Sequence, residues 1–312
     1  MSNLKPLLKW AGGKRKLAPL ITEIVSKEIP TTQNYVEPFF GGGAVYFELY
    51  NKNLFTNAEV NDVVPQLVNF YKTLSNAQSV DEIYKSISEK FEEFNALEET
   101  EERKDYFTKM RSEFNHLWLE EQRKTVKHKE FPDYLTEENS IKSTILLYVI
   151  NKTCFNGLFR VNKSGMFNVP LGSYKKIVMP SLSEFKETTD ALKKTEVHFG
   201  DYEVLIQKYL ESKNTFIYLD PPYVANSKTS DFTSYSKEGF KGDDNPDAEH
   251  LRLSENFELI TESGTKAILS NHNNPKALSI FVENKKDLFV YEINLTKTIG
   301  RVKDSTNTSS EL

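Results

Sequence analysis

Hydrophobic residues near the start of the chain alternate between helical spacing and short strand-like runs. In residues 14–28 the apolar positions are 17, 20, 21, 24 and 25, which form one face of an α-helix. YVEPF (35–39) then predicts a short strand, AVYFELYNK (44–52) a helix, residues 56–60 a second strand, and residues 65–74 a helix. A strand, a glycine-rich turn, a helix and a second strand within about 30 residues predict a βαβ unit.

The pattern changes in residues 80–147, which carry long charged and amphipathic helical stretches without a convincing strand. FNGLFRVNKSGMFNVPLGSYKK (155–176) follows, and in it two β-prone runs flank an Asn-Lys-Ser-Gly sequence that is typical of a hairpin turn. A helix over residues 182–194 leads back to strands, which we expect at TEVHF, TFIYL, KAILS and LFVYEI. We therefore predict an α/β domain formed by residues 1–75 and 180–312, with a helical domain inserted over residues 76–179.

Composition narrows the class of protein. The chain has 312 residues, of which 38% are hydrophobic and 27% charged, and this excludes collagen-like, disulfide-rich and wholly disordered proteins. The net charge of −5 argues against a protein that coats nucleic acid over its whole surface, but it leaves a local basic face open. We find no apolar membrane span and no signal peptide, and the single Cys154 fits a reducing compartment as a buried, inert thiol. We expect a soluble cytoplasmic protein.

The glycine turn in YVEPFFGGGAVYFEL (35–49) favours a nucleotide-like cofactor, because glycines there let the backbone approach a ligand beside a helix N-terminus. A dinucleotide fingerprint would need a third glycine where Tyr46 stands. KWAGGKRK (9–16) does not satisfy the phosphate-loop pattern, and neither the histidines nor the cysteine have metal-ligand spacing, so we expect no metal. Asp62, at the end of the second strand, can accept hydrogen bonds from ribose hydroxyls or cap the next helix.

FIYLDPPYVAN (216–226) is a buried strand that ends in an acid, two prolines and a tyrosine. The prolines hold Asp220 and the Pro221 carbonyl in one geometry, because Pro222 restricts the residue before it. Both groups accept hydrogen bonds and match the two hydrogens of an exocyclic amine, while Tyr223 offers a flat face for the base that carries it. An Asp-Pro turn with a surface tyrosine is the alternative, and it explains these residues only one at a time.

With these motifs together, the chain resembles a DNA adenine-N6 methyltransferase of the alpha, Dam-like group (D12 class). The match covers nearly the whole chain: KWAGGK (9–14), EPFFGGGAVYFEL (37–49), Asn61-Asp62, FNGLFRVNKSGMFNVPLG (155–172), DPPY (220–223), FTSY (232–235) and LSN (269–271). DPPY alone is shared with RNA guanine-N2 methyltransferases. The resemblance implies a Rossmann-like S-adenosyl-L-methionine-dependent sheet with an inserted helical target-recognition domain, and catalysis by Asp220, Pro221, Pro222 and Tyr223.

The resemblance also implies binding residues for each ligand. Those for the cofactor are Trp10, Lys14, Glu37, Pro38, Phe39, Gly41, Gly43, Asp62, Asp201 and Asp220, with Asp201 near the cofactor's adenine. Arg160 would fork onto a guanine edge of double-stranded DNA. The other expected DNA contacts are Lys9, Phe155, Asn156, Leu158, Asn162, Pro170, Tyr174, Lys175 and Lys176. Phe155 fills the gap left by an extruded base or belongs to the hairpin core.

The implied reaction needs the target adenine to flip out of the duplex, because a stacked base cannot reach the strand ends. The loop over residues 224–247 would then fold over it. The overlapping segment KGDDNPDAEH (241–250) is acidic, so we expect its distal part to face away from the duplex. GATC or another GAT-containing site is the leading expectation, in a bacterial or phage protein, with a cognate restriction endonuclease as a possible partner that acts on the same site.

Three other functions stay open at this point: an RNA guanine-N2 methyltransferase, a catalytically silent DNA-binding module and, more distantly, a nicotinamide dehydrogenase. One departure from the family also stands out. Its members continue after Arg301 into a final strand that begins near a Glu-Leu pair, whereas this chain stops at Glu311-Leu312. We therefore expect the last strand to be absent.

Overall fold

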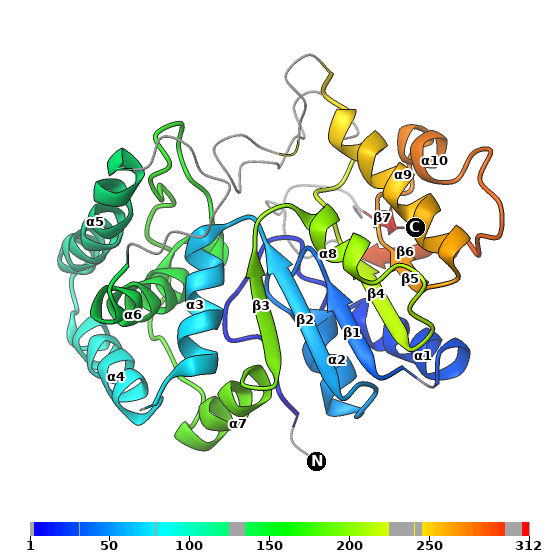
Figure 1. The fold of residues 1–312 in the computed structure, drawn as a ribbon. Coiled ribbons are helices and arrows are strands. Elements are labelled where there is room, and N and C mark those ends of the chain that lie inside the picture. The colour runs from blue at the N-terminus through cyan, green and yellow to red at the C-terminus, as the bar shows by residue number, and fades with distance from the viewer. Residues whose placement is uncertain are drawn as a thin grey trace.

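The centre of the fold is a five-stranded parallel sheet (Figure 1). The computed structural model describes residues 3–30, 32–78, 80–124, 135–224, 240, 245–296 and 308–311. The strands lie in the order β3-β2-β1-β4-β5, and their bounds are Asn34–Glu37 for β1, Asn57–Asp62 for β2, Thr195–Phe199 for β3, Thr215–Leu219 for β4 and Lys266–Leu269 for β5. The α/β expectation is therefore confirmed.

The strand order reverses direction between β1 and β4. From β1 the chain proceeds outward to β2 and β3, and then it returns to β4, which pairs with β1 on the other side. The carboxyl ends of two strands that diverge in this way leave a crevice where open α/β sheets bind their ligands. Glu37 ends β1, and Asp220 directly follows β4.

Alternating residues along the strands face two different layers of helices. Tyr35, Val60 and Phe216 share one apolar cluster with α1 (Ala18–Glu28), α2 (Ala44–Asn51) and α3 (Pro65–Asn76). Val36, Ile217 and Leu219 share the second cluster with α8 (Tyr202–Lys208), α9 (Ala248–Ser263) and α10 (Pro275–Phe281). Every residue of β4 is buried because both faces of the sheet are covered. Burial on both faces explains why the sequence of β4, TFIYL, is almost entirely apolar.

The segment without predicted strands forms three long helices, α4 (Val80–Ala96), α5 (Thr100–Lys124) and α6 (Glu137–Thr153). They stand beside the sheet at the left of Figure 1, with α3 between them and β3. Trp118 of α5 donates a hydrogen bond to Ser143 of α6, and Asn69 of α3 donates to the carbonyl of Ser140. Helix α7 (Leu182–Leu192) then returns the chain to β3, with Ser181 and Glu184 forming a capping box at its start.

Three local predictions differ from the structure. Residues 155–176 do not form regular hairpin strands: they contain the short 3-10 helix η1 (Phe155–Gly157) and isolated antiparallel bridges, Cys154 to Leu171 and Val161 to Phe167. The two runs do lie antiparallel across the turn, since the N–H of Phe155 donates to the Pro170 carbonyl and that of Asn168 to the Arg160 carbonyl, but these pairs are too widely spaced to form regular strands. The first helix begins at Ala18 rather than at residue 14, because Pro19 fits the first turn.

The third difference lies near the carboxyl terminus. LFVYEI was expected as a strand, but only its last residue belongs to one: β6 (Ile293–Thr296) pairs antiparallel with β7 (Thr308–Glu311) in a separate two-stranded sheet. Phe289 is 87% exposed, so apolar character alone did not bring this stretch into the sheet. β7 ends at Glu311, where the expected final strand of the family would begin, so the expectation about that strand stays a prediction.

Candidate active site

Carboxylic acids stand at the carboxyl ends of three adjacent strands, β2, β1 and β4. Glu37, on β1, is almost completely buried, and it accepts a hydrogen bond of 2.8 Å from the hydroxyl of Tyr35. Burial raises the pKa of Glu37 well above its usual range, and the nearby carboxyls of Asp220 and Asp62 raise that pKa further. The edge of the sheet therefore concentrates acidic groups that a cationic ligand would stabilise in the ionised form.

Asp62 links the glycine turn to helix α3. Its Oδ2 accepts a bond of 2.9 Å from the Gly41 N–H, and its Oδ1 accepts one of 2.9 Å from the Val64 N–H. Val64, rather than Asp62, is the N-cap residue of α3, so the capping interpretation is wrong in position although the acid does bind the start of the helix. Burial raises the pKa of Asp62 to about 6, while its backbone hydrogen bonds lower it.

The glycine turn adopts the backbone conformation that the sequence indicated. Gly41 and Gly43 have φ of 50° and 69°, in the left-handed region that favours glycine. A Cβ on Gly41 would lie 2.9 Å from the Trp10 ring, and one on Gly43 would lie 2.8 Å from Phe40. The turn is therefore glycine-rich partly because the protein's own aromatic rings pack against it.

The neighbours of the turn include three more of the predicted cofactor residues. Trp10 stacks on Phe159 with ring centres 5.2 Å apart, which connects the turn to residues 155–176. Phe39 packs against Tyr202 at 4.9 Å, and the Pro38 carbonyl accepts a bond from Asn61. These residues gather around the turn from β1, β2 and α8.

Lys14 and Asp220 form an ion pair across the crevice. The ammonium of Lys14 lies 2.9 Å from Asp220 Oδ1, and the two side chains are only 7% and 19% exposed. The same ammonium donates to the Gly12 carbonyl at 2.7 Å and lies 4.4 Å from the centre of the Tyr223 ring. Both Lys14 and Asp220 were expected at the cofactor from the resemblance, but their direct contact was not predicted.

Residues from α9 and the end of β5 hold the DPPY segment in place. His250 Nε2 donates to the Pro222 carbonyl at 2.9 Å, and Asn271 Oδ1 accepts from the N–H of Val224 at 3.0 Å. The ring of His272 meets that of Tyr223 edge-on at 4.7 Å. Sequence reasoning missed both histidines. Only LSN (269–271), which contains Asn271, signalled that the end of β5 belongs to the site.

Asp201 lies at the start of α8, where it accepts a hydrogen bond from the Glu203 N–H and caps the helix. Its carboxylate also pairs with Arg252 of α9 at 2.9 Å, and Arg252 binds Glu203 and Glu249 as well. Asp201 is 46% exposed, so this ion pair is partly screened by water. The contact of Asp201 with the cofactor's adenine stays a prediction, and Arg252 was not foreseen.

Residues 155–176 separate into an inner and an outer set. Phe159, Phe167 and Val169 are buried against the helices. The outer set includes the predicted DNA contacts Phe155, Asn156, Arg160, Pro170 and Lys175, which are all exposed, and Leu158, Asn162 and Tyr174, which are half-buried. Phe155 is 50% exposed, so the interpretation that it belongs to the hairpin core is wrong. Lys176 is exposed as well.

Several of these outer side chains are held by neighbours. Arg160 Nε donates to Asn168 Oδ1 at 2.9 Å, and Asn168 was not predicted as part of the site. The ammonium of Lys9 donates to the Tyr174 hydroxyl at 3.2 Å. Asn162 acts inside the turn, where its side chain accepts from the N–H groups of Ser164 and Met166. FTSY (232–235) and residues 241–244 of the acidic segment lie outside the described residues.

The strand-end site and residues 155–176 are joined through the amino-terminal segment. The side chain of Asn151 accepts from the Lys9 N–H at 2.8 Å and donates to the carbonyls of Lys9 and Gly157. Cys154, beside them, is buried, and burial raises its pKa to about 12, which agrees with an inert thiol.

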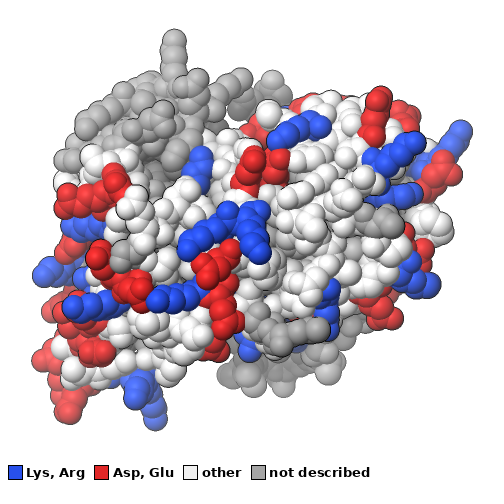
Figure 2. Space-filling view, turned by 60° about the horizontal axis from the view of Figure 1, so that its bottom comes forward, with Lys and Arg blue, Asp and Glu red and all other residues white. Residues whose placement is uncertain are grey.

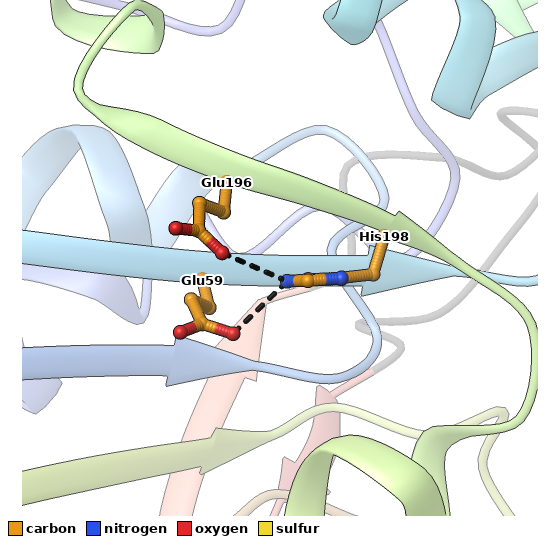
Figure 3. Close-up of side chains that lie close together, drawn as sticks. All are labelled: Glu59, Glu196 and His198. Atoms are coloured by element: carbon orange, nitrogen blue, oxygen red, sulfur yellow. Dashed lines mark hydrogen bonds and ion pairs between the residues drawn. The ribbon is translucent and has the colours of Figure 1, made fainter.

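A second cluster of titratable groups lies on the other side of the sheet from α3 (Figure 3). Glu59 of β2 and Glu196 and His198 of β3 point toward one another, with His198 Nε2 2.9 Å from Glu59 and 3.8 Å from Glu196. Lys208 also binds Glu59 at 2.6 Å, and Tyr209 donates to the same carboxylate. His198, Lys208 and Tyr209 therefore already bind the Glu59 carboxylate, which a metal ion at this cluster would need as a ligand. The cluster is an ion-pair network that joins β2 and β3 to α8.

Charge on the face in Figure 2 is mixed. With the lower side of Figure 1 turned forward, basic and acidic side chains are interspersed over the visible surface, without a continuous basic area. This face does not favour an extended polyanion. Among the described helices, none combines the length and the apolar character that crossing a bilayer requires.

A doubly wound parallel sheet with acids at the switch point defines an α/β enzyme of the kind that binds nucleoside cofactors. A profile of the D12 class N6 adenine-specific DNA methyltransferases matches residues 10–299, so the chain belongs to this family. Its activity is methylation of adenine N6 in DNA. The family assignment therefore excludes two of the alternatives left open by the sequence, an RNA guanine-N2 methyltransferase and a nicotinamide dehydrogenase.

Curated relatives agree with the family assignment. The chain is 37% identical over 273 residues to the type II methyltransferase M.MjaIII of Methanocaldococcus jannaschii, with 87% of this chain and 85% of that protein covered. It is 30% identical over 316 residues to the type II methyltransferase M1.LlaDCHI of Lactococcus lactis subsp. cremoris, with coverage of 99% and 94%. It is also 30% identical over 275 residues to the DNA adenine methylase of Vibrio cholerae, with coverage of 88% and 83%.

Proposed function

We propose that this methyltransferase takes its methyl group from S-adenosyl-L-methionine and transfers it to an adenine that is flipped out of duplex DNA into the crevice between β1 and β4. The observation that carries the proposal is the position of Asp220 and Tyr223 at the switch point of the sheet, beside Glu37 and Asp62. A planar base and a cationic methyl donor have complementary partners there.

The residues at the strand ends fit this cofactor. Its sulfonium and ammonium groups are positive, and the buried Glu37, whose pKa is raised, would become ionised beside them. Asp62 keeps lone pairs for ribose hydroxyls while its two backbone bonds fix its orientation. The cofactor supplies an activated methyl group. Trp10, Lys14, Glu37, Pro38, Phe39, Gly41, Gly43, Asp62, Asp201 and Asp220 are the residues we assign to its pocket.

Asp220 and the Pro221 carbonyl act on the target amine rather than as a nucleophile. The adenine amino lone pair is delocalised into the ring, and two acceptors for its hydrogens favour a pyramidal nitrogen whose lone pair points at the methyl carbon. When bound, the cofactor would supply its methyl carbon to this nitrogen and leave as a neutral thioether, and the proton that the methylated amine gives up would pass to solvent. Pro222 fixes this geometry and Tyr223 stacks on the base, so positioning supplies most of the rate enhancement.

We assign residues 76–179 to target recognition, as a helical domain inserted between residues 1–75 and 180–312. The exposed side chains of residues 155–176 support this role, because Arg160 is oriented by Asn168 with its terminal nitrogens available for a guanine edge. Lys9, Asn156, Leu158, Asn162, Pro170, Tyr174, Lys175 and Lys176 would add base or phosphate contacts. Phe155, half exposed, would enter the gap left by the flipped base.

The biological setting follows from the relatives. Two of them are type II methyltransferases, so a partner restriction endonuclease that cleaves the same site fits this chain, without obligate binding between the two. The resemblance of residues 155–172 to Dam-like enzymes makes GATC or another GAT-containing site the target that we propose. We expect the protein to work on DNA in the cytoplasm of a bacterium or of a phage-infected cell.

Transfer of a tritiated methyl group to adenine-containing duplex DNA tests the proposal. Asp220→Ala should lose transfer by a factor of about 100 or more, as removal of a positioned transition-state contact does. Asp190→Ala is the matched control, because Asp190 is an exposed acid on α7 and should leave the rate unchanged. Wild-type binding of cofactor and DNA without transfer would instead mean a silent DNA-binding module. Sequencing of DNA from expressing cells for N6-methyladenine would give the site.

A further inference from the structure

The ammonium of Lys14 lies in the corner between the two side chains that the proposed reaction assigns to the target base. It is 2.9 Å from Asp220 Oδ1 and 4.4 Å from the centre of the Tyr223 ring. Lys14 is only 7% exposed, so this is an internal contact rather than a loose pair at the surface. The Gly12 carbonyl, at 2.7 Å, fixes the same ammonium from a third direction.

This position excludes a stacked base. A base in contact with the Tyr223 face has its atoms about 3.5 to 4 Å from the ring, which is the layer in which the ammonium stands. The base's amino group would also need Asp220 as an acceptor, and Lys14 already donates to that carboxylate. Lys14 and the target adenine therefore compete for one space and for one carboxylate.

The contact has a physical reason in the free protein. Asp220 lies near the buried Glu37, and the two carboxyls disfavour each other's ionisation. Burying an ionised carboxylate is costly, and the Lys14 ammonium contributes both a hydrogen bond and a compensating charge to Asp220. In the ligand-free state Lys14 thus substitutes for the amine that the site is built to hold.

We propose that Lys14 occupies the amine-binding corner of the free protein and has to leave it before the target adenine can enter, so that this lysine sets the free-energy cost of inserting the base. The inference rests on the proposed roles of Asp220 and Tyr223. Lys14 is here a positioning residue, since it acts on the base by holding or releasing Asp220.

The experiment compares two duplexes that carry the methylation site, one with adenine and one with an abasic nucleotide at the target position. Their dissociation constants are measured without cofactor, so that the ratio reports contacts of the protein with the target base alone. Only the adenine duplex requires Lys14 to move, so the ratio of the abasic to the adenine constant reports its displacement. Lys14→Met keeps the length of the side chain and removes its charge, and this ratio should rise about tenfold.

Two further variants isolate the effect. Lys14→Arg retains a cation that can pair with Asp220, and it should keep the ratio near the wild-type value. Lys16→Met removes an exposed charge two residues away and should leave the ratio unchanged. Thermal unfolding checks the fold of each variant, and Lys14→Gln, which keeps a donor for the Gly12 carbonyl, replaces Lys14→Met if that variant does not fold.

An unchanged or lower ratio in the neutral Lys14 variants overturns the inference, because Lys14 would then be indifferent to the base or would help to bind it. An equal rise in Lys16→Met also overturns it, since the effect would be one of net charge. The proposed function has its own test. If the wild-type protein transfers no methyl group to the adenine duplex, both the proposed function and the inference about Lys14 fail. If the wild-type protein transfers the methyl group but the ratio does not rise in the neutral Lys14 variants, only the inference about Lys14 fails.

Discussion

The strand-end site and residues 155–176 differ in how their functional side chains are held. Lys14, Glu37 and Asp62 are buried or nearly so, and each is bound to another part of the protein without any ligand. Arg160 and Lys175 are exposed to solvent, and Arg160 donates a hydrogen bond from its Nε to Asn168. These proposed residues of the strand-end site are thus preorganised by burial, whereas the proposed DNA contacts are mostly exposed, with a few of them held by single neighbours.

The two regions are not independent, because Gly157 packs against Lys9 where they meet. Gly157 has φ of 64°, and a Cβ there would lie 2.4 Å from the Lys9 Cβ. We expect Gly157→Ala to lower the free energy of unfolding by about 2 to 5 kcal/mol, the sum of left-handed strain and overpacking. Urea denaturation measures it. Gly264→Ala has similar φ in open space and should cost only about 1 to 2 kcal/mol; equal losses would mean that the Lys9 contact is unimportant.

Arg160→Ala tests whether the exposed region reads bases. It should cost about 1 to 3 kcal/mol of binding free energy on the cognate duplex and remove discrimination at one base pair. Binding to a set of duplexes, each substituted at one position, measures this. Lys163→Ala, at the exposed tip of the same turn, should leave discrimination unchanged. Uniform weakening across all duplexes in Arg160→Ala would make Arg160 a phosphate contact instead.

The buried region should respond to pH where the exposed one does not. The pKa of Asp62 is raised to about 6, so its carboxylate, the better acceptor for ribose hydroxyls, is lost as the pH falls through 6. Affinity for S-adenosyl-L-homocysteine should then fall by up to about tenfold per pH unit below that value. Calorimetry from pH 5 to 8 measures it. Asp62→Asn should bind weakly with a flatter profile, and an unchanged slope in that variant would assign the titration to another group.

Lys175→Ala has the smallest expected effect. Lys175 is exposed, and a single phosphate contact of this kind should weaken binding to all duplexes by less than about fivefold while reducing the salt dependence by about one ion. Binding titrations at several salt concentrations measure both. Lys194→Ala removes a similar exposed lysine at the amino end of β3, away from the strand-end site, and should change neither. A sequence-dependent loss in Lys175→Ala would move this residue into the base-reading set.

The α/β order and most element positions could be predicted because hydrophobic periodicity and turn chemistry are local. The apolar run of β4 and the positive φ of Gly41 and Gly43 follow from residue type almost directly. LFVYEI failed because a strand exists only where a partner pairs with it, and the partner of Ile293 lies at Glu311. The expected hairpin formed only as isolated antiparallel bridges, and the side chain of Asn115 from α5 bonds to the backbone of Phe167 beside one of them.

The residues of the candidate site also fall into those that local sequence patterns reveal and those that depend on long-range contacts. DPPY, the glycine turn and Asp62 could be found from motifs, because each has its residues next to one another in sequence. His250, His272, Arg252 and Asn168 carried no such signal, because each contacts its partner in the site across a gap in the sequence that no local motif spans. The ion pair of Lys14 with Asp220 joins residues 206 positions apart in sequence, and no periodicity reports such a distance.

By itself, the sequence determined the class of fold, the family and the residue types at the ends of β1, β2 and β4, because these depend on patterns within short stretches of chain. Only the tertiary structure decided that Asp62 binds the start of α3 without being its N-cap, that Phe155 is exposed, and that Lys14 stands where the target amine is proposed to bind. Each of those outcomes depends on which distant side chains fill the same space once the sheet has brought its strand ends together.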